Sequence, residues 1–135
     1  MRLREEFIMP EQQRPSVWEL FKSFFHPKKA EPKVTTLNGV WWEQRHAIYR
    51  LGITSDAIQQ LGKISFAELL VEPDQVLDQD QDILEVESDK TVQNFKTPFE
   101  GTVVDVNHFL VENPDAINSN RQLENWVLDI RIDFD

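Results

Sequence analysis

The sequence predicts a small all-β barrel or sandwich with helical additions, on three observations. Short alternating or apolar runs, typical of half-buried strands, recur along most of the chain. Turn residues separate these runs about every ten positions, and the helical patterns between them are brief. The chain has 135 residues, which leaves room for a single modest hydrophobic core.

An N-terminal extension over residues 1–36 is predicted to precede a domain over residues 37–135. Residues 1–15 are charged and contain glutamines and prolines, a composition typical of disordered segments. Either Met1 or Met9 is the expected start of the protein.

Residues 16–26 carry the pattern of an amphipathic helix. Ser16 and Glu19 match a capping box, in which each side chain bonds an unpaired backbone N–H near the other residue. Apolar residues then recur on one face until Pro27 ends the helix. We expect this face to pack on the main domain or on a second copy, or else to dock on a partner or a membrane surface. Residues 27–36 are predicted to be a linker.

Within the domain, short strands are predicted to alternate with turns and brief helices. Thr54 is a candidate N-cap for a helix over residues 55–61, and Gly62 is expected in the αL conformation past its end. A helical turn is predicted to start at Asn113-Pro114, with proline at the first helical position. Turns are also expected at Asn38-Gly39, Pro73-Asp74 and Asp89-Lys90. The predicted strands cover residues 40–43, 47–52, 64–69, 83–88, 91–96, 102–106 and 126–132.

The charge distribution points to protein partners. The formal net charge is -10, and residues 34–135 carry nineteen acidic groups against seven basic ones. Such a body would repel nucleic acid and attract basic proteins. There is no signal-peptide pattern, and no apolar run approaches the roughly 20 residues of a membrane span, so we expect a cytoplasmic protein.

The residues do not indicate an enzyme or a metal-binding protein. The chain has no cysteine, which excludes disulfides, thiol catalysis and cysteine-ligated zinc. It also lacks a glycine-rich phosphate loop and a nucleophile elbow, and its three histidines show no metal-ligand spacing. Four aspartates lack the glycine and the terminal glutamate of an EF-hand loop and predict a solvated acidic face. They are Asp74, Asp78, Asp80 and Asp82.

One lysine stands out in the most acidic stretch. Residues 68–89 contain nine acids and no basic residue, and Lys90 is the first positive charge after Lys63. Lys90 falls at the predicted turn between the strands over residues 83–88 and 91–96. On composition alone it is an ordinary surface lysine; the alternative is a site of covalent modification.

The residues around this lysine resemble the hairpin of lipoyl domains. In those domains an acid lies three residues before the modified lysine, here Glu87, and a glycine lies eleven residues after it, here Gly101. Biotin carriers flank the lysine with methionines, which Ser88, Asp89 and Thr91 do not provide. The resemblance implies a barrel-sandwich hybrid fold of the lipoyl/biotinyl type, with lipoate attached covalently to Lys90. It also implies that Glu87 and Asp89 contact basic groups on a lipoate ligase, for which the protein is a non-catalytic substrate.

Flanking motifs are similar to the glycine cleavage H-protein family over residues 37–133. The resemblance is closer still to bacterial H-like paralogues, through Lys90-Thr91-Val92 and other short matches. It implies a carrier encoded beside a lipoate ligase, a macrodomain protein and a sirtuin that ADP-ribosylates it. The family motifs upstream and downstream of the lysine are Gly52-Ile53-Thr54, Gln60-Leu61-Gly62-Lys63-Ile64, Glu68-Leu69, Val106-Asn107, Asn113-Pro114-Asp115-Ala116-Ile117-Asn118 and Asn125-Trp126.

The chain differs from these paralogues in the predicted short helix before Gly62. Where an acidic ADP-ribose acceptor is expected before Gly62, the chain has Gln59-Gln60, and Asp56 is the nearest acid. No acceptor is therefore assigned.

Three hypotheses follow. The first is a specialised H-like lipoyl carrier in a redox- or stress-linked lipoylation and ADP-ribosylation system. The second is a glycine cleavage H protein that shuttles an aminomethyl group between decarboxylase, aminomethyltransferase and dihydrolipoyl dehydrogenase. The third is an acidic interaction module without lipoate.

Overall fold

The computed structural model describes residues 34–132. The helix predicted over residues 16–26 lies outside the described residues, as does most of the linker predicted over 27–36. The division into an extension and a domain at residue 37 remains a prediction.

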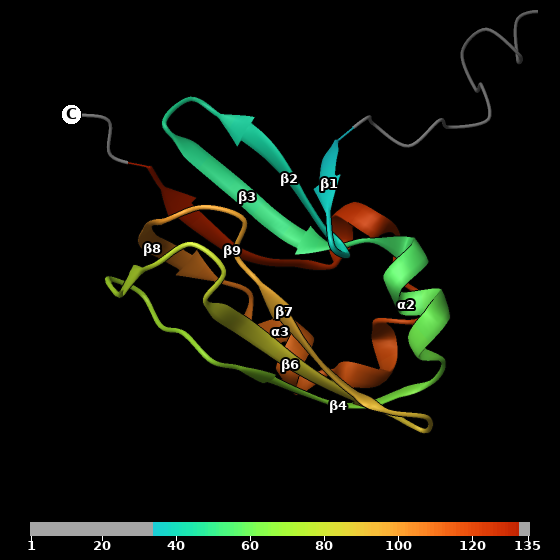
Figure 1. Ribbon diagram of the computed structural model, residues 1–135. Helices are drawn as coiled ribbons and strands as arrows, with labels where there is room; N and C mark the ends of the chain where they lie inside the picture. Colours follow the sequence, from blue (N-terminus) through green and yellow to red (C-terminus); the bar gives the residue numbers. More distant parts are fainter. Residues whose placement is uncertain (1–33, 133–135) are drawn as a thin grey trace, which may run out of the picture. The chain divides into compact units, whose positions relative to one another are not determined.

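The described residues form two antiparallel sheets (Figure 1). The larger sheet, in spatial order, consists of β1 (Thr35–Leu37), β2 (Val40–Arg45), β3 (Ile48–Ile53), β9 (Trp126–Arg131), β8 (Gly101–Val106) and β5 (Val76–Leu77). The smaller sheet consists of β4 (Ile64–Leu69), β6 (Asp82–Ser88) and β7 (Val92–Lys96). The helical elements are α2 (Ser55–Leu61), α3 (His108–Glu112), and the 3-10 turns η2 (Pro114–Ala116) and η3 (Gln122–Glu124). This arrangement confirms the predicted barrel-sandwich hybrid fold.

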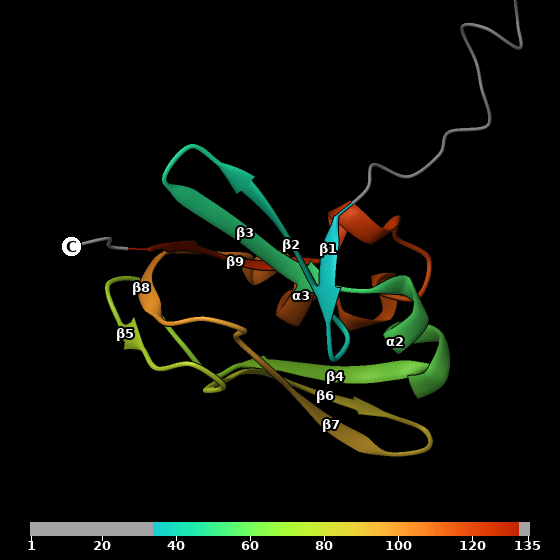
Figure 2. The same cartoon turned by 45° about the horizontal axis from the view of Figure 1, so that its top comes forward.

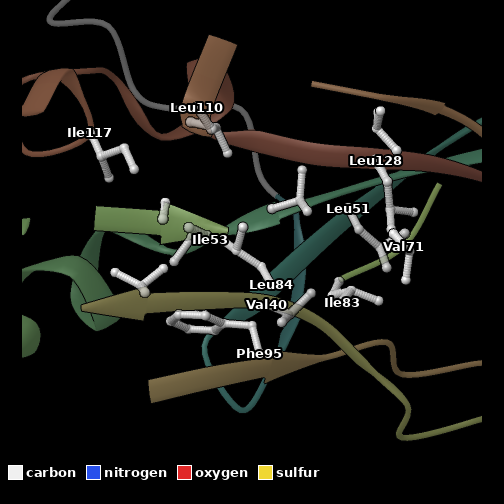
Figure 3. Packing of buried hydrophobic residues seen from close by; sticks show 14 of the residues in the cluster. Val40, Leu51, Ile53, Val71, Ile83, Leu84, Phe95, Leu110, Ile117 and Leu128 are labelled. Atoms are coloured by element: carbon white, nitrogen blue, oxygen red, sulfur yellow. The ribbon is translucent and has the colours of Figure 1, made fainter. Parts of the chain in front are cut away.

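The hydrophobic core lies between the two sheets. Figure 3 shows side chains from β6 and β7 of the smaller sheet and from β3 and β9 of the larger sheet filling this space. Phe95 of β7 is 1% exposed, and Leu84, Leu51 and Leu128 are fully buried. Each such side chain contributes about 1.5–3 kcal/mol through removal of apolar surface from water. The core therefore holds the smaller sheet, and the hairpin it contains, in a fixed place.

The start of the larger sheet corrects the linker predicted over residues 27–36. Thr35 and Thr36 belong to β1, which pairs with β2. The two residues of the turn, Asn38 and Gly39, have φ values of 51° and 83°. Positive φ at both central residues is the geometry of a tight two-residue hairpin, so the turn folds the preceding residues back along β2.

The alternation in β4 has an irregularity that the sequence did not reveal. Ile64 and Ala67 are buried, whereas Phe66 is 46% exposed. The pairing of β4 with β6 shifts register between Ile64 and Phe66. Because a bulge adds a residue to one strand, the side chains after it exchange faces. Four elements, β1, β5, α3 and η3, were not predicted, and each is five residues or fewer.

Candidate functional site

Lys90 lies exposed at the tip of the hairpin formed by β6 and β7 (Figure 1). The backbone N–H of Ser88 donates to the carbonyl of Thr91 at 2.8 Å and closes the turn. The Ser88 hydroxyl oxygen accepts from the backbone N–H groups of Lys90, at 3.1 Å, and Thr91, at 3.2 Å. The serine side chain thus stabilises a tight turn that contains no glycine. The predicted hairpin is confirmed.

A second set of contacts ties this tip to the end of α2. The backbone N–H of Asp89 donates to the carbonyl of Lys63 at 3.1 Å. A Cβ atom placed on Gly62 would lie 3.0 Å from Asp89 Oδ1 and 3.3 Å from Lys90 Cε. The stem of the Lys90 side chain therefore lies against Gly62. Figure 2 shows the tip of the β6–β7 hairpin near the end of α2.

Gly62 adopts a backbone conformation different from the predicted one. Its φ of 85° and ψ of -151° lie outside the αL region. This part of conformational space is essentially restricted to glycine. Its N–H still bonds the carbonyl of Ile58 and ends the helix.

Asn118 holds the same segment from a distant part of the chain. Its amide nitrogen Nδ2 donates to the carbonyl of Gly62 at 2.8 Å, and its Oδ1 accepts from the N–H of Ile64 at 2.9 Å. Residues 62–64, the hairpin tip and Asn118 are thereby linked by hydrogen bonds. The sequence contained Asn118 only as part of a family motif, without indicating this contact.

The three predicted site residues have different surroundings. Lys90 and Asp89 are both exposed and both lie against Gly62. Glu87 is exposed on β6, where it pairs with Phe66 of β4 and Val92 of β7. Within residues 34–132 the Lys90 ammonium makes no hydrogen bond or ion pair, so its nitrogen is accessible to an enzyme.

The acidic residues that precede the hairpin lie in turns or bond to the adjoining strand. Asp74 and Asp80 occupy turns with positive φ. Asp82 accepts hydrogen bonds from Lys96 Nζ, at 2.5 Å, and from Asn94, at 2.9 Å. The bond from Lys96, followed by that from Asn94, lowers the pKa of the Asp82 carboxyl below its usual value. In the described part of the chain, no group of three or more histidine or acidic side chains is arranged to hold a metal ion.

A polar hollow lies near the hairpin, between α2 and the β1–β2 turn. It has a volume of about 540 Å³ and is lined by Asn38, Thr54, Asp56 and Gln93, among others. Asp56 is the charged residue in this lining.

Within the described ranges, no helix is both long enough and apolar enough to span a bilayer.

The fold and the site together define a class: a barrel-sandwich domain that presents an exposed lysine at a tight hairpin tip. A family model for the glycine cleavage H-protein matches residues 33–134, and the chain belongs to that family. The predicted family is thereby confirmed.

Individual relatives agree with this assignment. The chain is 39% identical over 87 residues to a glycine cleavage system H protein of Nostoc sp., a match that spans 63% of this chain and 65% of the relative. It is 42% identical over 88 residues to the corresponding protein of Listeria innocua, covering 65% of this chain and 70% of the relative. The crystal structure of a glycine cleavage system H protein from Mycobacterium marinum is 28% identical, with a TM-score of 0.64, and the match covers 71% of this chain and 80% of that one.

Glycine cleavage H proteins are non-catalytic carriers with lipoate attached covalently to a lysine. The predicted cofactor and the predicted non-enzymatic carrier class are therefore confirmed. An exposed lysine without a partner in the described residues fits such an attachment.

Proposed function

We propose that Lys90 carries the lipoate and that the hairpin presents it to several enzymes in turn. The observation that supports this most directly is the exposed Lys90 nitrogen at a turn held by Ser88 and by the Asp89–Lys63 hydrogen bond. A lipoate ligase would join the lipoate carboxyl to the AMP part of ATP, forming lipoyl-AMP and releasing pyrophosphate. The deprotonated Lys90 nitrogen would then form the amide as AMP leaves. Glu87 and Asp89 are proposed to contact basic groups of that ligase.

Intact mass tests this proposal. After incubation with lipoate, ATP and a lipoate ligase, the protein should gain one lipoyl group, and Lys90→Arg should gain none. Lys63→Arg is the matched control, because Lys63 is also exposed and contributes only its carbonyl to the site. No gain by the unsubstituted protein would instead favour an acidic interaction module without lipoate. A gain that survives Lys90→Arg would overturn Lys90 as the attachment site.

We further propose that the loaded carrier shuttles an aminomethyl group among the glycine cleavage enzymes: decarboxylase, aminomethyltransferase and dihydrolipoyl dehydrogenase. Membership of the H-protein family supports this role. Lipoate, when bound, would supply the oxidant: the C–C bond of glycine breaks as CO2 leaves, its electrons reduce the lipoyl disulfide, one sulfur receives the aminomethyl group and the other becomes a thiol. The carboxylate of Asp56 lines the hollow beside the hairpin and would attract the cationic amine.

A second candidate function is the specialised H-like carrier with a macrodomain protein and a sirtuin as partners. Lys90-Thr91-Val92 and the N-terminal extension predicted from the sequence favour it. Gln59 and Gln60 are exposed on α2 in place of the expected acid, and Asp56 is exposed one turn earlier.

Glycine decarboxylase distinguishes the two functions. With glycine and decarboxylase, the lipoylated protein should become loaded with methylamine if it serves glycine cleavage. Lack of loading, together with ADP-ribosylation by the sirtuin, would support the specialised carrier. Asp56→Asn should reduce retention of the aminomethyl group in the first case.

A further inference from the structure

The outer face of the smaller sheet carries an exposed apolar pair near the end of the β6–β7 hairpin. Phe66 of β4, Glu87 of β6 and Val92 of β7 are cross-strand partners, in that order. Directly paired residues project to the same face with Cβ atoms about 5 Å apart, so the three side chains form one row. Phe66 is 46% exposed and Val92 is 52% exposed. The row therefore crosses all three strands, with the acidic Glu87 between the apolar Phe66 and Val92.

The bulge in β4 creates this row. Without the register shift between Ile64 and Phe66, the alternation of the strand would place Phe66 with the buried Ile64. The bulge instead exposes a large aromatic side chain at a cost in buried apolar area. Bulges that redirect a side chain are common next to functional sites.

The next row is negatively charged. Glu68 of β4 lies directly opposite Glu85 of β6, and like charges in this arrangement are destabilising. Farther along the sheet, Asp82 is neutralised by Lys96. Glu68, Glu85 and Glu87 have no such ion pair within residues 34–132. The face is therefore apolar near the hairpin tip and anionic behind it.

We infer that Phe66, Glu87 and Val92 form a docking surface for the lipoate ligase that acylates Lys90. The ligase would contact it with an apolar patch bordered by arginine or lysine. This inference rests on the proposed attachment of lipoate to Lys90. Uncompensated carboxylates favour a cationic partner, and buried apolar anchors at the centre of an interface supply much of the binding energy.

The ligase is the enzyme that this surface suits best. Glu87 and Val92 lie three residues before and two residues after Lys90. An enzyme that reacts at Lys90 Nζ must approach to within the length of one lysine side chain, so it must cover the adjoining strand ends. Enzymes that act on the lipoyl disulfide meet the end of a longer arm and do not need to cover these strands.

Lipoylation kinetics test the surface. Phe66→Ser with Val92→Ser should lower kcat/KM of the ligase about tenfold, mainly through KM, as expected for the loss of two apolar contacts. Phe109→Ser with Val104→Ser is the matched control, because these residues are 54% and 42% exposed on α3 and β8. The control should retain the kinetics of the unchanged protein.

Two further measurements make the outcome decisive. Glu87→Lys should raise the KM of the ligase and make that KM less dependent on salt concentration. It also provides a second variant if the double serine variant does not fold. Variants that are already lipoylated should be reduced and reoxidised by dihydrolipoyl dehydrogenase at the unchanged rate. Unchanged ligase kinetics in every variant, or a defect confined to the dehydrogenase, would overturn the docking surface while leaving lipoylation of Lys90 intact. Absence of lipoylation in the unchanged protein would instead overturn the attachment proposal.

Discussion

Gly62 allows α2 and the hairpin tip to lie close together, because it has no Cβ atom. It combines a positive φ with close contacts to two side chains of the tip. Asn118 bonds its carbonyl and thereby restrains it. A single residue at the end of a helix thus determines the surface against which the Lys90 stem lies.

Gly62→Ala is predicted to destabilise the protein by about 1–3 kcal/mol, because alanine is strained at this φ and ψ. The added Cβ would also lie 3.0 Å from Asp89 Oδ1 and displace that carboxylate. Urea unfolding measures the loss of stability, and the rate of lipoylation of Lys90 should fall in parallel. Lys63→Ala, next in the chain and exposed, should change neither. Equal unfolding midpoints for the two variants would contradict the prediction.

The α2 helix and the β6–β7 hairpin are stabilised by contacts between residues that lie close together in the sequence. The predicted bounds of α2 are confirmed, because the signals are local: the Thr54 hydroxyl oxygen accepts from the N–H of Ala57 at 3.1 Å. The hairpin was likewise predicted from two runs around Asp89-Lys90. The exposed face of Phe66 was not predicted, because the bulge arises from the pairing of β4 with β6.

The Asp82–Lys96 pair across this hairpin gives a pH-dependent prediction. The hydrogen bond from Lys96 lowers the pKa of Asp82 in the folded state. The pair therefore stabilises the fold above the unfolded pKa of about 3.9, and this stability is lost as pH falls through the lower folded value. Both side chains are substantially exposed, so the contribution is at most about 1 kcal/mol.

Lys96→Gln should raise the pKa of Asp82 toward its usual value, as measured by NMR titration of the carboxyl carbon. Stability should also depend less steeply on pH below about 4. Lys63→Gln removes the same charge away from Asp82 and should leave that pKa nearly unchanged. An unaltered titration in Lys96→Gln would show that the ion pair does not persist in solution.

The two sheets share one core, so the stability of the hairpin depends on the whole domain. Phe95 is contributed by β7, within a few residues of Lys90, yet it packs among residues of both sheets (Figure 3). Loss of its side chain would leave a cavity between the layers.

Phe95→Ala is predicted to cost about 3–5 kcal/mol, a large part of the 5–15 kcal/mol typical of a domain. Denaturant unfolding followed by tryptophan fluorescence should show one earlier transition for the described domain. Val92→Ala, on the exposed part of the same strand, should cost under about 1 kcal/mol. Comparable losses for the two variants would be inconsistent with a shared core.

The sequence by itself determined the all-β class, the helix over residues 55–61, the hairpin around Lys90 and the likeness to H proteins. These features depend on turn chemistry, capping and residue spacing, which act over a few positions. Only the tertiary structure decided that Gly62, Lys63 and Asn118 support the hairpin tip, and that Phe66 faces solvent beside Glu87 and Val92. Those contacts join segments more than 20 residues apart, and a strand's register, including its bulge, is defined only when its partner is in place.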